Sequence, residues 1–229
     1  VSKRAIGILT NSSAEVSITA ARLNVSKEKI RYVPMHTNIE TPAMSSTDEG
    51  FILSAGRTLR DYAVLLKVAP QLNMPIHIIC GANDILIHPL PKNITIHKDI
   101  AYDDYLDYLK RCSFMVLPLL PTMRSTGQVV MFEAMAFGKP VIASESPGTV
   151  DYIEHDRNGL LIEGSNAIDL AAACNRLIHD IRLRQHLGQQ SLQSILGKHL
   201  IETHARHKLH AIHELLSALQ FNSILAQRR

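Results

Sequence analysis

The sequence has no tryptophan, few other aromatic residues and almost no excess of charge. Aromatic side chains make up 5% of its 229 residues, and 24 Lys and Arg against 21 Asp and Glu give a formal charge of +3. Proteins that bind nucleic acid gather basic side chains on one surface and stack bases on aromatic rings. The composition therefore argues against a nucleic-acid partner.

Cysteines and long apolar runs are also scarce. The three cysteines, Cys80, Cys112 and Cys174, are far apart and set in apolar segments without CxxC spacing. We therefore predict reduced core residues and no disulfide or zinc site. No segment reaches the roughly 18 apolar residues of a membrane-spanning helix, and no signal-type block follows the N-terminus. We expect a cytoplasmic protein, and the start at Val1 without Met indicates a piece of a longer chain.

Short apolar runs alternate with helical patterns from Phe51 onward, in a sequence with 46% hydrophobic residues that can bury a core. The runs predicted as strands are 51–55, 76–80, 94–97, 114–119, 141–143 and 160–162. The segments between them carry apolar residues at helical spacing, and the helix that begins at Asn166 turns Leu170 and Cys174 inward. This alternation predicts a parallel sheet with helices on both faces and ligands at the carboxyl ends of its strands.

A phosphate-type turn, a helix with one carboxylate and a buried strand follow one another between Ser125 and Ala143. Ser125, Thr126 and Gly127 precede good helix formers, and a helix N-terminus offers free N–H groups and a positive dipole end that suit a diphosphate. Glu133 comes six residues after Gly127. That is about 9 Å along the helix axis, the reach from a diphosphate to an attached ribose. A carboxylate there can accept hydrogen bonds from a sugar diol.

Three motifs carry a resemblance to a known family. Residues 54–57 (Ser-Ala-Gly-Arg), residues 132–142 (Phe-Glu-Ala-Met-Ala-Phe-Gly-Lys-Pro-Val-Ile), and Gly148 with residues 158–161 (Asn-Gly-Leu-Leu) occur in this order. In these motifs the chain resembles the C-terminal, donor-binding domain of a GT-B glycosyltransferase of the retaining family 4 (group 1) type. The resemblance covers residues 50–195 and implies an α/β fold with a Rossmann-like, doubly wound parallel sheet.

The resemblance and the composition together divide the chain into four parts. Residues 1–35 carry a strand, a helix and a strand, are too short for a domain of their own, and resemble a remnant of the family's N-terminal acceptor domain. Residues 36–50 are rich in Thr, Ser and Pro and are predicted to be an interdomain linker. Residues 51–197 form the predicted donor-binding domain. Residues 198–229 are predicted to form a helix to Leu219 that crosses back toward the N-terminal domain, followed by a frayed end.

The resemblance also implies roles for individual residues. It assigns the diphosphate to Gly56, Arg57, Arg60, Thr126, Gly127, Gln128 and Val129, the ribose to Glu133, and the base to a region with His97, Lys98 and Ile100. Arg60 follows a shortened loop and stands near the place where a Lys-Gly pair is more usual. No metal and no cofactor are implied, because Arg57, Arg60 and the helix N-terminus would stabilise the departing diphosphate.

One departure from the family's pattern concerns the transferred sugar. The family commonly has two glutamates separated by seven residues, of which the first touches that sugar, and eight positions before Glu133 this chain has Ser125. Ser125 and Gln128 can bond sugar hydroxyls but supply no charge, so the catalytic residue stays unknown. Ser125 and Thr126 could also be helix N-caps. A surface carboxylate at Glu133 and a solvated loop cation at Arg57 are the alternatives to ligand binding.

Histidines and aspartates invite other interpretations. The histidines assigned to the last helix are His199, His204, His207, His210 and His213. Most of these histidines are three residues apart, a spacing that does not keep side chains on one face of a helix. A solvated face is therefore favoured over a metal site. For His36 and His97, a plain loop position is favoured over contact with a base or acceptor. Asp99, Asp103 and Asp104 are interpreted as the cap and first turn of the following helix.

The leading hypothesis is the nucleotide-sugar half of a retaining, metal-independent glycosyltransferase. It would move a hexosyl group from a nucleoside diphosphate to a glycan, lipid or small-molecule acceptor, with the acceptor site in the missing N-terminal domain. Peripheral contact with a membrane surface stays open. So do two other hypotheses: another GT-B enzyme, such as a sugar-nucleotide epimerase or an inverting transferase, and a nucleotide-binding or assembly module without turnover, which Ser125 favours.

Overall fold

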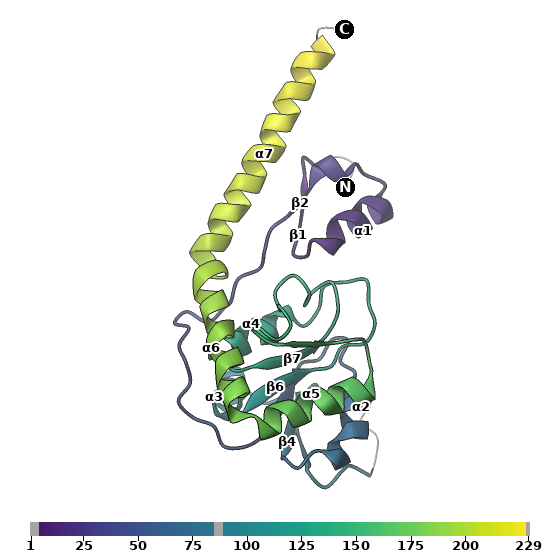
Figure 1. The fold of residues 1–229 in the computed structure, drawn as a ribbon. Coiled ribbons are helices and arrows are strands. Elements are labelled where there is room, and N and C mark those ends of the chain that lie inside the picture. The colour runs from purple at the N-terminus through teal and green to yellow at the C-terminus, as the bar shows by residue number, and fades with distance from the viewer. Residues whose placement is uncertain (1–4, 85–88, 228–229) are drawn as a thin grey trace.

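The computed structural model describes residues 5–84 and 89–227 of the chain. Its centre is a six-stranded sheet in which all neighbouring strands run parallel (Figure 1). The strands are β3 (Ile52–Ala55), β4 (Ile76–Cys80), β5 (Ile94–Lys98), β6 (Phe114–Leu117), β7 (Val141–Ser144) and β8 (Leu160–Ile162). The predicted α/β class and all six predicted strands are confirmed, with boundaries that shift by no more than two residues.

Helices cover both faces of this sheet. They are α2 (Tyr62–Val68) and α5 (Ala167–His179) on one face, and α3 (Tyr102–Arg111) and α4 (Gln128–Ala136) on the other. In β3, Ile52 packs with α2 and α5, whereas the next residue, Leu53, packs with α3 and α4. Successive strand residues point to opposite faces, so an unbroken apolar strand is buried on both sides. The three cysteines are free and buried in this core, as predicted.

The strand order β5-β4-β3-β6-β7-β8 changes direction between β3 and β6. The chain adds β4 and β5 on one side of β3 and then returns to place β6 on the other side. The loops that leave the carboxyl ends of β3 and β6 therefore diverge, and open α/β sheets bind ligands in the crevice at this point. Gly56 follows β3, and residues 125–127 follow β6. The two predicted ligand loops thus lie at one crevice.

The residues before the linker (36–50) form a small unit at the carboxyl end of the large sheet. The unit consists of β1 (Ile8–Thr10), α1 (Ala14–Leu23), a 3-10 helix (Lys27–Lys29) and β2 (Ile30–Tyr32), with β1 and β2 paired in parallel. The predicted strand, helix and strand are therefore present. The backbone N–H and hydroxyl of Ser13 bond to the Asp151 carboxylate at 2.7 and 2.5 Å. The start of α1 is thus attached to a loop at the carboxyl end of the large sheet.

The predicted linker, residues 36–50, contains no helix or strand. It is nevertheless bound to the rest of the chain through its backbone. The N–H of Thr37 donates to the carbonyl of His199 at 2.9 Å, and the N–H of Ala43 donates to the carbonyl of Ala136, at the end of α4, at 3.0 Å. The linker therefore follows a fixed course along α4.

The C-terminal part differs from the prediction. The predicted helix from residue 198 to Leu219 is present as α7 (Ile201–Gln227), but the helix before it, α6 (Ile181–Lys198), was not predicted. The two helices are separated by a break at His199, and the sequence of α6 is polar and only weakly periodic. The predicted frayed end from residue 221 is also wrong, because the backbone stays helical to Gln227 among residues of good helix propensity. Residues 228 and 229 lie outside the described part.

Helix α7 extends away from the large sheet, beside the unit of β1, α1 and β2 (Figure 1). Arg31 at β2 and Glu214 on α7 form an ion pair of 2.7 Å that links the two. The last helix therefore contacts the N-terminal unit. Across residues 5–84 and 89–227, no helix combines the length and the apolar character that crossing a bilayer requires.

Leu177 on α5 is fully buried between α5 and the sheet. Truncation in Leu177→Ala removes apolar contacts and leaves a cavity, so we expect the free energy of unfolding to fall by about 2–5 kcal/mol. The matched control is Leu196→Ala on α6, whose side chain is 47% exposed. The control should change stability by about 0.5 kcal/mol or less. Urea denaturation of both variants measures the difference, and equal losses would contradict this packing.

Candidate functional site

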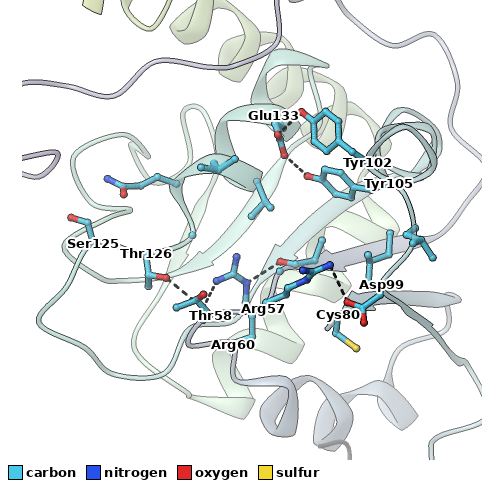
Figure 2. Close-up of a pocket in the computed structure, with 18 residues that line it drawn as sticks. Arg57, Thr58, Arg60, Cys80, Asp99, Tyr102, Tyr105, Ser125, Thr126 and Glu133 are labelled. Atoms are coloured by element: carbon cyan, nitrogen blue, oxygen red, sulfur yellow. Dashed lines mark hydrogen bonds and ion pairs between the residues drawn. The ribbon is translucent and has the colours of Figure 1, made fainter. Parts of the chain in front are cut away.

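A cavity of about 660 Å³ opens at the carboxyl end of the large sheet (Figure 2). It is lined by Ala55, Gly56, Arg57, Thr58, Arg60, Ile79, Cys80, Asp99, Ile100, Tyr102, Tyr105, Ser125, Thr126, Gly127, Gln128, Val129, Val130 and Glu133. Every residue predicted to contact a diphosphate or ribose is among them. The volume lies within the range of about 300–1,000 Å³ that small-molecule sites occupy.

The N-terminus of α4 opens onto this cavity. Its N-cap, Gly127, has φ of +81°, a left-handed conformation that glycine adopts without strain. A Cβ at Gly127 would lie 2.9 Å from Leu117 Cδ2, so a larger residue would also be crowded. Within the described residues no side chain caps this end, and the alternative role of Ser125 and Thr126 as caps is therefore wrong. The first N–H groups of α4 stay available to an anion.

Arg60 places a half-buried cation in the cavity wall. Its Nε donates to the carbonyl of Ala55 at 2.8 Å, and its Nη1 donates to the carbonyl of Thr58 at 2.7 Å. Its guanidinium covers Gly56 so closely that a Cβ there would collide with Nη2. Burial lowers the pKa of Arg60, but arginine remains charged in proteins. In the described part of the chain no carboxylate forms an ion pair with it.

Arg57 lies at the open side of the cavity. Its side chain is 67% exposed, and its Nη2 lies 3.0 Å from Asp99 Oδ1 (Figure 2). The interpretation of Asp99 as a helix cap is wrong, because Ala101 is the N-cap of α3. Asp103 and Asp104 do occupy the first turn. An exposed ion pair contributes at most about 1 kcal/mol, so Arg57 can exchange Asp99 for an anionic ligand at little cost.

Glu133 is only 1% exposed and is surrounded by hydrogen-bond donors. Its Oε1 accepts from the Tyr102 hydroxyl at 2.7 Å and from Asn38 Nδ2 at 2.9 Å. Its Oε2 accepts from the Tyr105 hydroxyl at 2.7 Å (Figure 2). Burial and the Glu133 carboxylate raise the pKa of Tyr102 to about 12 and that of Tyr105 well above its usual value, so both remain donors at neutral pH. Oε2 keeps a lone pair for a further donor.

Ser125 and Gln128 contact the N-terminal unit. The N–H of Ser125 donates to Glu15 Oε1 at 2.8 Å, and Gln128 Nε2 donates to the carbonyl of Asn11 at 3.1 Å. The side-chain amide of Gln128 is therefore directed to another part of the protein and not to a sugar hydroxyl, the contact that the sequence had suggested for this side chain. The hydroxyl oxygen of Ser125 is buried and has no hydrogen-bond partner among the described residues.

The predicted base region is only partly at the cavity. Ile100 lines it, whereas His97 and Lys98 do not. The His97 ring stacks on His77, with ring centroids 5.1 Å apart, because these residues lie on the paired strands β4 and β5. Lys98 Nζ donates to the carbonyl of Ala82 at 3.2 Å. Both side chains are thus engaged outside the cavity, and of the three residues predicted for the base region only Ile100 lines it.

The C-terminal histidines serve different local roles. His199 lies between α6 and α7 and not on the last helix, and its Nδ1 is 3.2 Å from the carbonyl of Met35. Burial lowers the pKa of His199, so its neutral form is favoured. His204 Nδ1 lies 2.7 Å from the carbonyl of Pro34. The remaining members, His207, His210 and His213, are exposed, as predicted. The described residues contain no group of three or more side chains suited to hold a metal ion.

The partners of Glu133 were not predicted from the sequence. Two of these partners, Tyr102 and Tyr105, lie on α3. Their i, i+3 spacing places them on one helix face, and two hydroxyls on that face were the available signal. Asn38 lies in a polar linker with no periodicity, so nothing in the sequence marked it.

Together these groups form a site with two kinds of chemistry. Arg57, Arg60 and the N-terminus of α4 supply positive charge and donors, which suit a phosphorylated group. Glu133 supplies a fixed acceptor, which suits hydroxyl groups. Apolar Ile79 and Ile100 also line the cavity, which suits a flat, weakly polar ring.

Comparison with known proteins gives a family match. The model of the family "Glycosyl transferases group 1" matches residues 38–194, more than half of the chain. An uncharacterized glycosyltransferase of Methanocaldococcus jannaschii is 37% identical over 90 residues, which are 39% of this chain and 24% of that protein. Another uncharacterized glycosyltransferase, from Haemophilus influenzae, is 25% identical over 203 residues, 80% of this chain and 56% of that protein. The chain thus spans about half or less of the length of these relatives.

Solved structures agree in fold. The Anabaena protein HepE in complex with UDP-glucose superposes with a TM-score of 0.76 at 17% sequence identity, over 94% of this chain and 65% of that chain. At this identity the similarity supports the fold, which includes the parallel sheet and the helices on both of its faces. By its family match and its sheet, the chain belongs to the group 1 glycosyltransferases and has the Rossmann-like architecture of GT-B enzymes.

Proposed function

We propose that this chain is the donor-binding half of a retaining, metal-independent glycosyltransferase that uses a nucleoside-diphosphate sugar. The observation that carries the proposal is the single cavity that joins Arg57, Arg60, the free N-terminus of α4 and Glu133. The two arginines and the N-terminus of α4 would bind a diphosphate, and Glu133 would bind a ribose. The acceptor, a glycan, lipid or small molecule, would bind in the part of the protein that precedes this chain.

The distances along α4 support one orientation of the donor. A diphosphate at Gly127 places an attached ribose near Glu133, about 9 Å further along the helix. The base then lies near Ile100, where the cavity wall is apolar. HepE was solved with UDP-glucose bound, and a ligand of that class matches the charges, length and volume of the cavity in this chain.

The same groups account for the proposed chemistry. Breaking the bond between sugar and diphosphate builds negative charge on the leaving phosphate. Arg60 is desolvated and held by two backbone carbonyls, so it needs no reorganisation to stabilise this charge. Arg57 and the N–H groups of α4 add to it. These residues fill the role that a divalent cation has in other transferases, and the proposal therefore includes no metal.

Glu133→Gln tests the ribose contact. The substitution keeps the shape of the side chain but removes the charge and replaces one acceptor with a donor. We expect wild type to bind UDP or GDP about tenfold more tightly than the corresponding 2′,3′-dideoxynucleotide and Glu133→Gln to lose this preference. Isothermal calorimetry measures both. Glu154→Gln, at an exposed carboxylate, is the control. No binding to either nucleotide, or an unchanged preference in Glu133→Gln, would refute the assignment.

Arg60→Met tests the diphosphate contact. The ratio of the uridine and UDP dissociation constants, or of those for guanosine and GDP, isolates what the phosphates contribute. Loss of a charge-assisted contact should lower this ratio by about 10- to 100-fold. Arg206→Met changes an exposed arginine on α7 and should leave the ratio unaltered. A ratio that is equal in wild type and Arg60→Met would exclude Arg60 from the diphosphate site.

The full-length protein tests stereochemistry and metal independence. We expect the product, analysed by NMR, to retain the anomeric configuration of the donor sugar, and excess EDTA to leave the rate unchanged. An inverted product would favour an inverting GT-B transferase. Epimerised nucleotide sugar without transfer would favour an epimerase. A rate that falls with EDTA and returns with Mg²⁺ or Mn²⁺ would contradict the metal-free mechanism.

A further inference from the structure

A carboxylate from the N-terminal unit reaches the cavity wall. Glu15 lies in the first turn of α1, and its Oε1 accepts the backbone N–H of Ser125 at 2.8 Å. Ser125 is one of the residues that line the cavity. The two residues are 110 positions apart in the chain, so this contact exists only because the N-terminal unit is docked on the loops at the carboxyl end of the large sheet.

Several hydrogen bonds hold the start of α1 in this place. The N–H and hydroxyl of Ser13 both bond to Asp151. The carbonyl of Asn11 accepts from Gln128 at 3.1 Å and from the Tyr152 hydroxyl at 2.5 Å. The N-cap residue Ser13 and the preceding Asn11 are thus bound to the loop after β7 or to the start of α4. The Glu15 carboxylate is therefore held in position by its own backbone.

The hydrogen bond to Ser125 leaves much of the Glu15 carboxylate unused. A carboxylate has about four acceptor positions, and within the described residues only the Ser125 N–H donates to it. Next to it lies the buried Ser125 hydroxyl, which has no partner within the same residues. Beside Ser125, which lines the cavity, the protein thus holds a carboxylate with unused acceptor positions and a hydroxyl without a partner among the described residues.

The proposed orientation of the donor places its sugar at this end. In Figure 2, Glu133 lies on the side of Tyr102 and Tyr105, Ser125 and Thr126 lie on the other side, and Arg57 and Arg60 lie below both. A sugar attached to the far side of the diphosphate therefore extends toward Ser125. Its hydroxyl groups are donors that need acceptors when water is excluded.

We infer that Glu15 binds and positions the transferred sugar through its hydroxyl groups. This inference rests on the proposed function. Position 125 of this chain is a serine and supplies no charge. The negative charge near the sugar would instead come from Glu15 on α1. Carboxylates are the strong acceptors for sugar hydroxyls, and a charge that comes from a separate unit acts only while that unit is docked. Sugar recognition then depends on the N-terminal unit, whereas recognition of the nucleoside diphosphate does not.

Glu15→Gln tests the inference on the 229-residue chain. The glutamine oxygen can still accept from the Ser125 N–H, so the docking contact is kept while the charge is lost. The probes are UDP and UDP-glucose, UDP and UDP-N-acetylglucosamine, and GDP and GDP-mannose, measured by calorimetry. We expect the affinity for the best-binding sugar conjugate to fall about tenfold, while the affinity for its free diphosphate changes less than about twofold. Glu28→Gln, an exposed carboxylate of the same unit, should change neither.

The alternative role for Glu15 is only to hold the loop at Ser125. That role predicts equal weakening of the free diphosphate and its sugar conjugate in Glu15→Gln, and this result would overturn the inference. Unchanged binding of both ligands would overturn it as well. Failure of wild type to bind any diphosphate or conjugate would instead refute the proposed function, and the inference with it. The two failures are therefore distinguishable.

Ser125→Glu supplies an independent test in the same assay. In the Glu15→Gln background it returns a negative charge to the cavity wall, and we expect it to recover at least part of the lost affinity for the sugar conjugate. In the wild-type background it places two carboxylates side by side, which repel each other, so the affinity should fall. The same substitution would thus have opposite effects in the two backgrounds. Equal effects in both would count against a shared role of positions 15 and 125.

Discussion

The structure depends on the burial of helix α4. Seven of its nine residues are buried, so the helix cannot slide or rotate without breaking the core packing. Its N-terminus, which keeps free N–H groups, is therefore fixed at the carboxyl end of the sheet. Its one charged residue, Glu133, must be compensated inside the protein, and two tyrosines and Asn38 provide the donors. One rigid element thus fixes both the anion site and the acceptor for hydroxyl groups.

The cavity is completed by segments that are distant in the sequence. The Asn38 amide joins the linker to Glu133, and Glu15 joins the N-terminal unit to Ser125. Hydrogen bonds of Asn11, Ser13 and Glu15 join the N-terminal unit to the loops of the large sheet and the start of α4. Each hydrogen bond contributes only about 0.5–1.5 kcal/mol, and polar interfaces of this kind permit relative motion of domains. The sheet and α4 can therefore stay rigid while the surroundings of Ser125 change.

Local patterns explain which parts of the fold could be predicted. Strands buried on both faces appear as unbroken apolar runs, and α5 shows both its Asn166 cap and its inward stripe. Helix α6 was missed because its polar sequence shows only weak helical periodicity. Asp99 was misassigned because a carboxylate before a helix is usually a cap, and here it pairs with Arg57. His97 and Lys98 were misplaced because their side chains are engaged away from the cavity.

The sequence by itself determined the class of the fold, the order of its strands along the chain, and the positions of Arg57, Arg60 and Glu133 beside turns that end at one edge of the sheet. These properties follow from periodicity and spacing, which are local. Only the tertiary structure decided which donors hold Glu133, that the Gln128 amide points to Asn11, and that a carboxylate from α1 lies beside Ser125. Glu133 and Asn38 are 95 residues apart, and Ser125 and Glu15 are 110 apart. Such pairs come into contact only when separate segments pack together, so no local sequence pattern predicts them.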